Sequence, residues 1–511
     1  MELTAALIKY GLSIHRRLNA DTNAPLNSQT KTLINLLKKA AYTQFGNHYN
    51  FSQILSKYDL IAEFKKNVPI HDYDKIYNEW WHLCREGGKD IAWKGKINYF
   101  ALSSGTSGSP SKYIPISDEM IKSIRKTGVK MYSELAISGM PLQQFSKHML
   151  MLGGNVRLKK ENHYYYGDLS GILIHKLPLW FTNKYKPGLK IASIQDYHEK
   201  MLAIAKNAPK WDIGIVSGIP SWVQMMLEYI KEVNKVNNIQ EIWPNFKIYA
   251  HGGVAFEPYR EAISKLIGKN TTFLDSYLAS EGFIAYQDSM TDSHMKLALN
   301  NDIFYEFVPF NSENFDSAGN IKPNATTYTV GEVKEGVDYA ILLTTCAGAW
   351  RYLIGDTIKF VDAEKCKLII TGRTKHFLSI CGEHLSIDNM NQALQAVQRN
   401  LNINIREFTV NGERRTNQYS HKWYISVEKP FNKNIVAEEL DRQLQLLNDD
   451  YKAVRKAVLD KISVETLTPN VFYDYLKSKN KLGGQSKFPR VMNNEQFKDW
   501  ELFVRSAVEL V

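Results

Sequence analysis

The sequence predicts an α/β fold, with a large N-terminal domain of mixed β-sheets and packed helices and a smaller C-terminal α+β domain. Three observations lead to this prediction. The chain has 511 residues, more than one ordinary hydrophobic core accommodates. Short β-rich runs alternate with helical patterns up to about residue 366, and after about residue 370 the elements become smaller and more mixed. We expect domains at 1–368 and 369–511, joined by a short hinge, because no long Gly/Pro/Ser linker separates them.

Composition and charge exclude several classes of protein. Apolar residues make up 44% of the chain, as in packed globular proteins, and no apolar run reaches the ~20 residues that a membrane span requires. The net charge of +11 is spread along the chain among acidic residues, so we expect solvated surface and no nucleic-acid-binding stripe. Attraction of an anionic small molecule such as a nucleotide is the second interpretation of this charge.

The N-terminal segment and the cysteines indicate a cytoplasmic protein. The N-terminus lacks the basic start, apolar core and cleavage site of a signal peptide. Cys84, Cys346, Cys366 and Cys381 are scattered without CxxC pairing, which favours reduced thiols over disulfides or a zinc site. The sequence does not set the oligomeric state, and a monomer is the working expectation.

The segment WDIGIVSGIPSWVQMMLEYIKEVNKV predicts a strand, a turn and a helix in the large domain. The run 213–216 is typical of a buried strand, and Gly218 and Pro220 follow it as a turn. The expected helix repeats apolar residues on one face, at Trp222, Met226, Tyr229, Ile230 and Val233.

A second unit of this kind follows in FKIYAHGGVAFEPYREAISKLIG. It predicts a strand, then a turn at Gly252 and Gly253, then a helix that starts near Pro258. The helix is expected to end at Gly268, since glycine commonly terminates helices.

The smaller domain has its own helix and strand patterns. SIDNMNQALQAVQRNL predicts a helix capped by Ser386, with one apolar side formed by Met390, Leu394, Val397 and Leu401. The strands INIREFTV and HKWYISVE flank an expected polar turn around Asn411 and Gly412. Amphipathic helices are expected over 434–459.

The stretch FALSSGTSGSPSKYIPIS combines serines, a threonine and glycines between a predicted strand and a predicted helix with Ser117 as its N-cap. A tight turn of this composition exposes backbone N–H groups and hydroxyls, which phosphate oxygens require, and Lys112 adds a positive charge. It is not a Walker A loop, because Pro110 stands where the second glycine is needed. A flexible connection is the plainer alternative.

Five motifs in a fixed order resemble those of adenylate-forming enzymes, the superfamily of acyl-CoA synthetases, peptide-synthetase adenylation domains and luciferases. They are SSGTSGSPSK, HGGVAF at 251–256, DSYLASEG at 275–282, RYLIGD at 351–356 and TGRTKHFLSICGEHLS at 371–386. Within this superfamily, TQFGNHYNF, VPIHDYDKIY, YFALSSGTSG and WRYLIGDTIKF are similar to the Gretchen Hagen 3 family of acyl acid amido synthetases, in the shorter form of its bacterial members. The resemblance runs from about residue 43 to residue 491.

The resemblance implies an ATP-dependent ligase. Such an enzyme adenylates a small-molecule carboxylic acid, releases pyrophosphate and transfers the acyl group to an amine such as an amino acid. ATP and Mg²⁺ are the implied cofactors, and the C-terminal domain would rotate between the two half-reactions. An acyl-CoA ligase and a catalytically inactive nucleotide-binding relative are the alternatives.

The resemblance also implies site residues. The implied ATP- and AMP-binding residues are Ser103, Ser104, Gly105, Thr106, Ser107, Gly252, Gly253, Tyr277, Ser280, Asp356 and Arg373. Among them, Tyr277 would stack near the adenine and Asp356 would accept hydrogen bonds from the ribose hydroxyls. The implied catalytic residues are Lys112, Glu281 as the magnesium ligand, and Lys487. An acyl-pocket wall is expected at Gly167, Ser170 and Gly171, with core packing as the alternative for the tyrosines before them.

Taken one at a time, these residues have plainer interpretations. Glu281 alone would be a surface or capping carboxylate, and Asp356 a turn residue. Lys487 and Arg373 would be solvated charges, and Tyr277 would be core. The joint order of the motifs favours the functional interpretation.

The sequence departs from the superfamily pattern at two places. The superfamily has an arginine directly after the tyrosine of Tyr-x-x-Gly-Asp, where this chain has Leu353, and Arg351 precedes that tyrosine instead. An arginine role is therefore not carried over. Glu383 and His384 stand in a segment that differs from plant members, and we expect a structural role for them at the hinge or the following helix.

Overall fold

The computed structural model describes most of the chain. The described residues are 24–103, 112–154, 156–268, 271–316, 319–375, 378, 380, 383, 385–415, 418–428, 431–448, 451–452, 454–455, 459–479, 481 and 487–508. Within these ranges, no helix combines the length and the apolarity that crossing a membrane requires.

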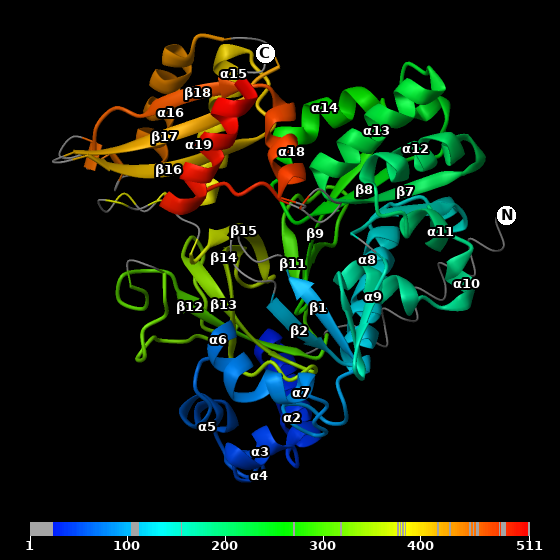
Figure 1. Cartoon of the computed structure of the whole chain (residues 1–511). Coiled ribbons are helices and arrows are strands. Elements are labelled where there is room, and N and C mark those ends of the chain that lie inside the picture. The colour runs from blue at the N-terminus through cyan, green and yellow to red at the C-terminus, as the bar shows by residue number, and fades with distance from the viewer. Residues whose placement is uncertain are drawn as a thin grey trace.

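The protein is organised around one large β-sheet, which we call the main sheet (Figure 1). Among the described residues it has eleven strands in the order β12-β13-β14-β15-β11-β10-β9-β8-β7-β3-β6. These strands are β3 His148–Leu152, β6 Tyr185–Lys186, β7 Ile213–Gly218, β8 Ile248–Gly252, β9 Thr272–Ala279, β10 Gly282–Gln287, β11 Met295–Leu297, β12 Ile303–Pro309, β13 Asp338–Thr345, β14 Tyr352–Asp362 and β15 Lys367–Arg373.

Strand β9 divides the main sheet into two halves. From β9 through β8, β7 and β3 to β6 the pairings are parallel, and from β9 through β10 to β12 they are antiparallel. Helix α13 (Pro220–Asn234) connects β7 to β8, and α14 (Glu257–Ile267) connects β8 to β9. The carboxyl ends of these parallel strands lie at one edge, so their loops converge there.

Helices surround the main sheet on several sides (Figure 1). Those before β9, besides α13 and α14, are α2 Pro25–Ala40, α3 Gln44–His48, α4 Phe51–Ile54, α5 Leu60–Asn67, α6 Tyr73–Ile76, α7 His82–Arg85, α8 Asp118–Ile137, α9 Leu169–His175, α10 Leu179–Thr182, α11 Leu189–Ala192 and α12 Tyr197–Asn207. Helices α2 to α7 form a layer below β12 and β13, and α11 to α14 lie beside the parallel half.

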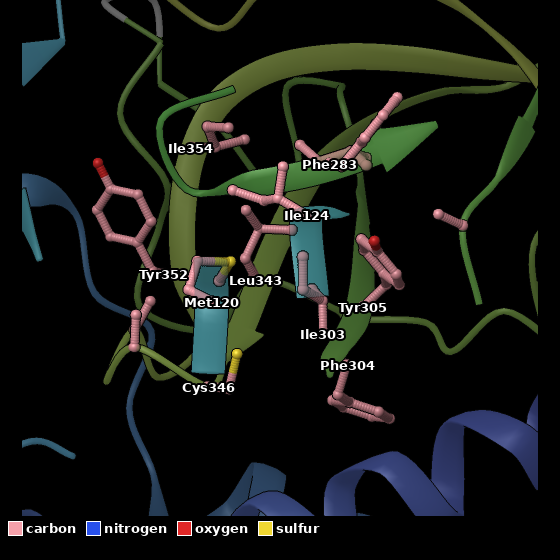
Figure 2. Close-up of a cluster of buried hydrophobic side chains, with 14 of the residues drawn as sticks. Met120, Ile124, Phe283, Ile303, Phe304, Tyr305, Leu343, Cys346, Tyr352 and Ile354 are labelled. Carbon is pink, nitrogen blue, oxygen red and sulfur yellow. The ribbon is translucent and has the colours of Figure 1, made fainter. Parts of the chain in front are cut away.

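Among the described residues, the largest hydrophobic core lies between helices α2 to α8 and the antiparallel half of the main sheet. Figure 2 shows Met120 and Ile124 of α8 beside Phe283 of β10 and Leu343 of β13. Cys346 belongs to this core and, like Cys84, is a buried free thiol, as the scattered cysteines predicted, and Cys366 is buried as well. Cys381 lies outside the described residues.

Both predicted strand–turn–helix units are present. Strand β7 covers the first predicted strand, and α14 ends at Gly268, which takes a φ of 96°. The predicted apolar face of α13 holds for Trp222, Met226 and Ile230, which are buried. It was wrong for Val233, which lies in the last turn of α13 and is 36% exposed.

A smaller sheet carries the serine-glycine stretch. Its strands, in the order β2-β1-β5-β4, are β1 Tyr99–Ser103, β2 Lys112–Ile116, β4 Lys159–Glu161 and β5 Tyr164–Gly167. The predicted helix follows the stretch, but within the stretch KYIPI forms β2, antiparallel to β1, a strand that the sequence did not predict. Strand β2 is at the sheet edge, where Pro115 is tolerated. Helix α8 follows β2, with the predicted N-cap Ser117, whose side chain accepts a hydrogen bond from the Met120 N–H.

The C-terminal part forms a separate α+β unit. Its elements are α15 Ile387–Leu401, β16 Phe408–Arg415, β17 Gln418–Ser426, α16 Lys433–Leu447, β18 Ser463–Leu467, α18 Pro469–Ser478 and α19 Asn494–Val508. Ser386 caps α15 as predicted. The predicted turn at Asn411 and Gly412 was wrong, because both lie inside β16, where Gly412 faces His421. A Cβ on Gly412 would overlap the Ile380 side chain, so the glycine serves close packing.

The connection between the two parts follows β15. This strand belongs to the main sheet up to Arg373, a few residues beyond the expected boundary at 368. In the connection, Glu383 is fully buried and accepts a hydrogen bond from the Ile380 N–H, and its Oε1 lies 2.8 Å from Nε2 of His421. These contacts confirm the structural role expected for Glu383, whereas His384 lies outside the described residues.

A buried ion pair links β12 to the turn before β14. Arg351 donates from Nη2 to Oε1 of Glu306 at 2.8 Å, and their side chains are 6% and 1% exposed. The Arg351 guanidinium also donates to the carbonyl oxygens of Lys65 and Val68, both at 2.7 Å. These bonds hold Arg351 in the left-handed region, at a φ of 44°. Arg351 is therefore a structural residue, in agreement with the departure of this segment from the superfamily pattern.

We expect the substitution Arg351→Met to lower the thermal unfolding midpoint strongly. It leaves Glu306 buried without a counter-charge, and breaking a buried ion pair in this way costs about 3–5 kcal/mol. Calorimetry measures the midpoint, with Lys265→Met as the control, because the Lys265–Glu261 pair is exposed. Equal midpoints for the two variants would contradict the assigned role of Arg351.

Candidate functional site

Residues from four strands meet where the parallel half of the main sheet joins the antiparallel half. Gly252 ends β8, Tyr277 lies near the end of β9, and Glu281 follows in the tight turn before β10. Asp356 of β14 lies opposite Arg373 at the end of β15. The structure therefore brings together residues from three of the sequence motifs and the start of a fourth.

The carboxylate of Asp356 is the centre of this group. The Tyr277 hydroxyl donates to its Oδ2 at 2.5 Å, and Nε of Arg373 donates to its Oδ1 at 2.8 Å. Burial, together with the charge of Asp356, raises the pKa of Tyr277 well above its usual value, so the hydroxyl remains a donor. Each carboxylate oxygen keeps acceptor capacity for one more donor.

The two glycines allow close approach of other groups. A Cβ on Gly252 would overlap the backbone carbonyl oxygen of Ser276 on β9. Gly253 takes a left-handed φ of 85°, and a Cβ there would lie 3.5 Å from Nζ of Lys487. Strand packing therefore explains Gly252 without any ligand, and the approach of a lysine side chain accompanies Gly253.

Lys487 reaches the group from the C-terminal part of the chain. Water still contacts its side chain, but the protein around it lowers its pKa by desolvation. The charge of Asp356 opposes this shift and that of Arg373 adds to it. Lys487 is thus near enough to both residues for their charges to act on it.

Glu281 and Lys112 form the other side of the group. Glu281 is 8% exposed, and burial raises its pKa to about 7, with a further increase from Asp356. Lys112 begins β2, and burial lowers its pKa while the charge of Glu281 opposes the shift. The Lys112 Nζ lies 5.2 Å from the ring centroid of Tyr73. The structure thus brings the predicted Lys112 and Glu281 near one another.

The remaining predicted phosphate-binding residues are only partly described. Ser103 ends β1, directly before the stretch. Ser104, Gly105, Thr106 and Ser107 lie outside the described residues. Ser280 is half-buried in the turn that also contains Glu281.

The predicted acyl-pocket segment starts beside the serine-glycine stretch. Gly167 of β5 pairs with Ala101 of β1, and Ser170 and Gly171 open α9. The Ser170 hydroxyl accepts a hydrogen bond from the Gly154 N–H at 3.1 Å, which gives it a structural contact. Tyr164 is buried and Tyr165 is 38% exposed, as alternating strand positions require.

The structure adds two tyrosines that the sequence prediction missed. Tyr352 is fully buried, and its hydroxyl has no hydrogen-bond partner among the described residues. Burial raises its pKa, with a further increase from Glu281, so the two side chains are neighbours. Tyr73 accepts a hydrogen bond from the Tyr113 N–H at 2.9 Å and lies beneath Lys112. Both tyrosines lie within quoted motifs, but among 28 tyrosines the sequence did not separate them from core residues.

The donor set at Glu281 suits one kind of metal ion. Among the described residues, no three His, Cys, Asp or Glu side chains form a cluster that could hold a metal by themselves. Mg²⁺ commonly binds through one or two carboxylates together with substrate phosphates. A buried carboxylate with a raised pKa, such as Glu281, fits that arrangement, because a cation would favour its ionised form.

Family comparisons cover most of the sequence. Residues 14–156 and 144–272 match the GH3 family N-terminal domain. Residues 296–372 match the GH3 family central domain, and residues 388–496 match the GH3 family C-terminal domain.

Curated relatives are similar over part of their length. The jasmonoyl–L-amino acid synthetase JAR4 of Nicotiana attenuata is 23% identical over 394 residues, which cover 65% of this chain and 66% of the relative. The jasmonoyl–L-amino acid synthetase GH3.5 of Oryza sativa subsp. japonica is 24% identical over 294 residues, which cover 53% of this chain and 50% of the relative. The aligned segments thus span less than two thirds of the length of these relatives.

Solved structures share the fold along nearly the whole chain. The GH3.15 acyl acid amido synthetase has a TM-score of 0.78 at 16% identity, covering 96% of this chain and 95% of its own. A 2-hydroxyisobutyryl-CoA ligase in complex with 2-HIB-AMP has a TM-score of 0.60 at 12% identity, covering 94% and 91%. With three consecutive family domains matched along most of its length, the chain belongs to the GH3 family.

Proposed function

We propose that this protein is an ATP-dependent acyl acid amido synthetase. It adenylates a carboxylic acid, releases pyrophosphate, and transfers the acyl group to an amine, an amino acid being the favoured acceptor. The observation that carries this proposal is the group around Asp356, where Tyr277, Arg373 and Lys487 converge beside Gly253. Membership of the GH3 family supports the same activity.

The chemistry explains why such a group is needed. A free carboxylate has no good leaving group, whereas an acyl-adenylate releases AMP when an amine attacks its carbonyl carbon. In the first half-reaction, a carboxylate oxygen bonds to the α-phosphorus as the bond from that phosphorus to the pyrophosphate oxygen breaks. The enzyme must therefore align two anions and neutralise their charge.

The nucleotide would be held by groups with spare hydrogen-bonding capacity. Asp356 would accept hydrogen bonds from the ribose hydroxyls, while Tyr277 and Arg373 keep its carboxylate oriented. Lys112 and Lys487 would face the phosphates from opposite parts of the chain. The serine-glycine stretch, with Ser103 through Ser107, would supply N–H groups and hydroxyls to the same phosphates.

Glu281 is the residue that would hold Mg²⁺ together with the phosphates of ATP. The bound ion would supply charge neutralisation for the departing pyrophosphate. Burial disfavours the ionised form of Glu281, so cation binding and loss of its proton are coupled.

For the second half-reaction we propose that the C-terminal domain, from the end of β15 onward, changes its position. The two units would divide after Arg373, a few residues beyond the boundary between 1–368 and 369–511 that the sequence predicts. In the GH3.15 structure, an acyl acid amido synthetase is in complex with 2,4-DB, and the jasmonoyl synthetases are named for joining an acid to an amino acid. These names support a carboxylic acid and an amino acid as the substrate classes here.

We expect Asp356→Asn to lower kcat/KM for ATP in acid-dependent ATP–pyrophosphate exchange by at least about tenfold. The substitution removes charge-assisted hydrogen bonds, each worth about 1.5–3 kcal/mol. Asp362→Asn on the same strand is the matched control, because Asp362 lies at the end of β14 and pairs with the exposed Lys365. If neither wild type nor Asp356→Asn shows exchange with any acid of a broad panel, the result would favour a catalytically inactive relative.

A separate measurement identifies the acceptor of the acyl group. With ATP, Mg²⁺ and an acid that supports exchange, we expect amide formation when amino acids are supplied. Product analysis by mass spectrometry distinguishes the amide from an acyl-CoA. Acyl-CoA formation with no amide from any amine would show that the protein is an acyl-CoA ligase.

We expect the stability of the ligand-free protein to depend on pH through Glu281. Its folded pKa of about 7 exceeds its usual 4.5, so the folded state binds the proton more tightly than the unfolded state. This contribution is fully present below about pH 4.5 and is lost as the pH rises through 7, a change of about 3 kcal/mol.

Unfolding midpoints of wild type and Glu281→Gln at pH 5 and pH 8 test this dependence. Glutamine stays neutral, so the variant should gain stability relative to wild type as the pH rises. Glu261→Gln, at an exposed position of α14, should follow wild type. Parallel curves for wild type and Glu281→Gln would rule out a raised pKa at this site.

A further inference from the structure

Three polar side chains, two of them buried and one partly buried, join the C-terminal part to helix α14. The hydroxyl of Tyr259, in α14, donates to Oε1 of Glu407 at 2.8 Å. Arg490 donates from Nη1 to Oε2 of Glu407 at 2.5 Å, and from Nη2 to the Tyr259 hydroxyl at 3.3 Å. We call Tyr259, Glu407 and Arg490 the interdomain triad.

The triad is well placed to be a strong contact. Tyr259 is 1% exposed and Glu407 is 3% exposed. Charge-assisted hydrogen bonds in such surroundings are shorter and stronger than those at a surface. By contrast, an ion pair between Arg406 and Glu228 at 3.3 Å, which also crosses this boundary, is partly exposed on both sides and adds little.

The segment that carries Arg490 also carries Lys487. On one side, Phe488 packs against Phe472 and Trp500, with ring centroids 4.9 and 5.2 Å apart. The Val410 N–H donates to the Arg490 carbonyl oxygen at 2.9 Å, which ties the segment to β16. The segment is therefore part of the C-terminal unit, which also packs on the N-terminal part through a shared apolar cluster that includes Trp222 and Phe472. The triad adds polar contacts that have a fixed geometry between this segment and α14.

Helix α14 in turn is connected to the nucleotide site. It begins at Glu257, shortly after the turn at Gly252 and Gly253. Lys487 lies against Gly253, three residues before Arg490 in the sequence. One short segment thus contacts the start of the β8–β9 crossover twice, with Lys487 at the turn and with Arg490 on the helix.

We propose that the interdomain triad positions Lys487 in the nucleotide site and thereby favours the first half-reaction. The inference rests on the proposed function and assigns Tyr259, Glu407 and Arg490 as positioning residues that act through Lys487. Loss of the triad loosens the C-terminal unit on α14, where only the shared apolar cluster then remains, and Lys487 moves out of the site with it.

Small-angle X-ray scattering of the ligand-free, full-length protein tests the structural half of the proposal. Tyr259→Phe keeps the ring and removes the hydroxyl, and Glu407→Gln removes the charge, so each weakens the triad differently. Both variants should have a larger radius of gyration than wild type. Scattering curves identical to wild type for both variants would overturn the proposal.

The C-terminal part offers a matched control. The Tyr451 hydroxyl donates to Oδ1 of Asp441 at 2.5 Å, and Nε of Arg455 donates to the same oxygen at 2.7 Å. This group has the same chemistry as the triad but lies within one unit. Tyr451→Phe should therefore scatter as wild type does, and an equal expansion in Tyr451→Phe would show that general destabilisation causes the effect.

A double-mutant cycle tests the catalytic half. Tyr259→Phe should lower kcat for acid-dependent ATP–pyrophosphate exchange about tenfold, with a smaller effect on KM for ATP. In a Lys487→Ala background the same substitution should have no further effect, because the triad acts through that lysine. Additive losses would show that the triad acts elsewhere and would overturn the proposal.

The two readouts separate this inference from the proposed function. If wild type shows no exchange with any acid, the proposed function fails, and the scattering measurement alone still decides whether the triad seats the C-terminal unit. If wild type is active, the proposal stands only when both the scattering measurement and the double-mutant cycle agree with it.

Discussion

The carboxylate of Asp356 is the interaction on which the arrangement of the site depends. It accepts hydrogen bonds from Tyr277 on β9 and Arg373 on β15, and it lies on β14 itself. One side chain thereby ties the antiparallel strands β14 and β15 to β9, where the sheet changes to parallel pairing. Arg373 is also the last residue of β15, so this contact fixes the point from which the C-terminal part departs.

The charges around Asp356 do not balance in the protein alone. Arg373, Lys112 and Lys487 are cationic, while Asp356 is anionic and Glu281 is held near its titration point by burial. Such a site has an excess of positive charge, which attracts a polyanion and is relieved when one binds. The overall charge of +11 does not predict this excess, since it is spread over the whole chain. The excess arises because four strands and a C-terminal segment converge.

The sequence predicted the elements whose signals are local. The strand at 213–216 and the cap at Ser386 are examples, since buried runs and side-chain caps act within a few residues. It wrongly placed Gly412 in a turn. This glycine is needed because a Cβ would overlap the side chain of Ile380, a tertiary neighbour that the local sequence pattern does not contain. The sequence did not predict β2, an edge strand that tolerates Pro115. The order of the motifs along the chain predicted Asp356 and Glu281 as site residues. No motif predicted the contact between Tyr259 and Glu407, because these residues are 148 positions apart in the sequence.

The same charges explain why Lys487 needs support from outside the site. Desolvation and the nearby Arg373 both disfavour the protonated form of Lys487. Placing this lysine beside Asp356 therefore includes an unfavourable free-energy contribution when ATP is not bound. The charge of Asp356 opposes these effects, and a second favourable contribution comes from groups three residues away, where Arg490 meets Glu407 and Tyr259. The triad holds the segment whether or not a nucleotide is bound. The attraction between the phosphates and Lys487 acts only when ATP is bound. The two contributions therefore differ in their dependence on ATP, and weakening the triad makes seating of Lys487 depend on the nucleotide.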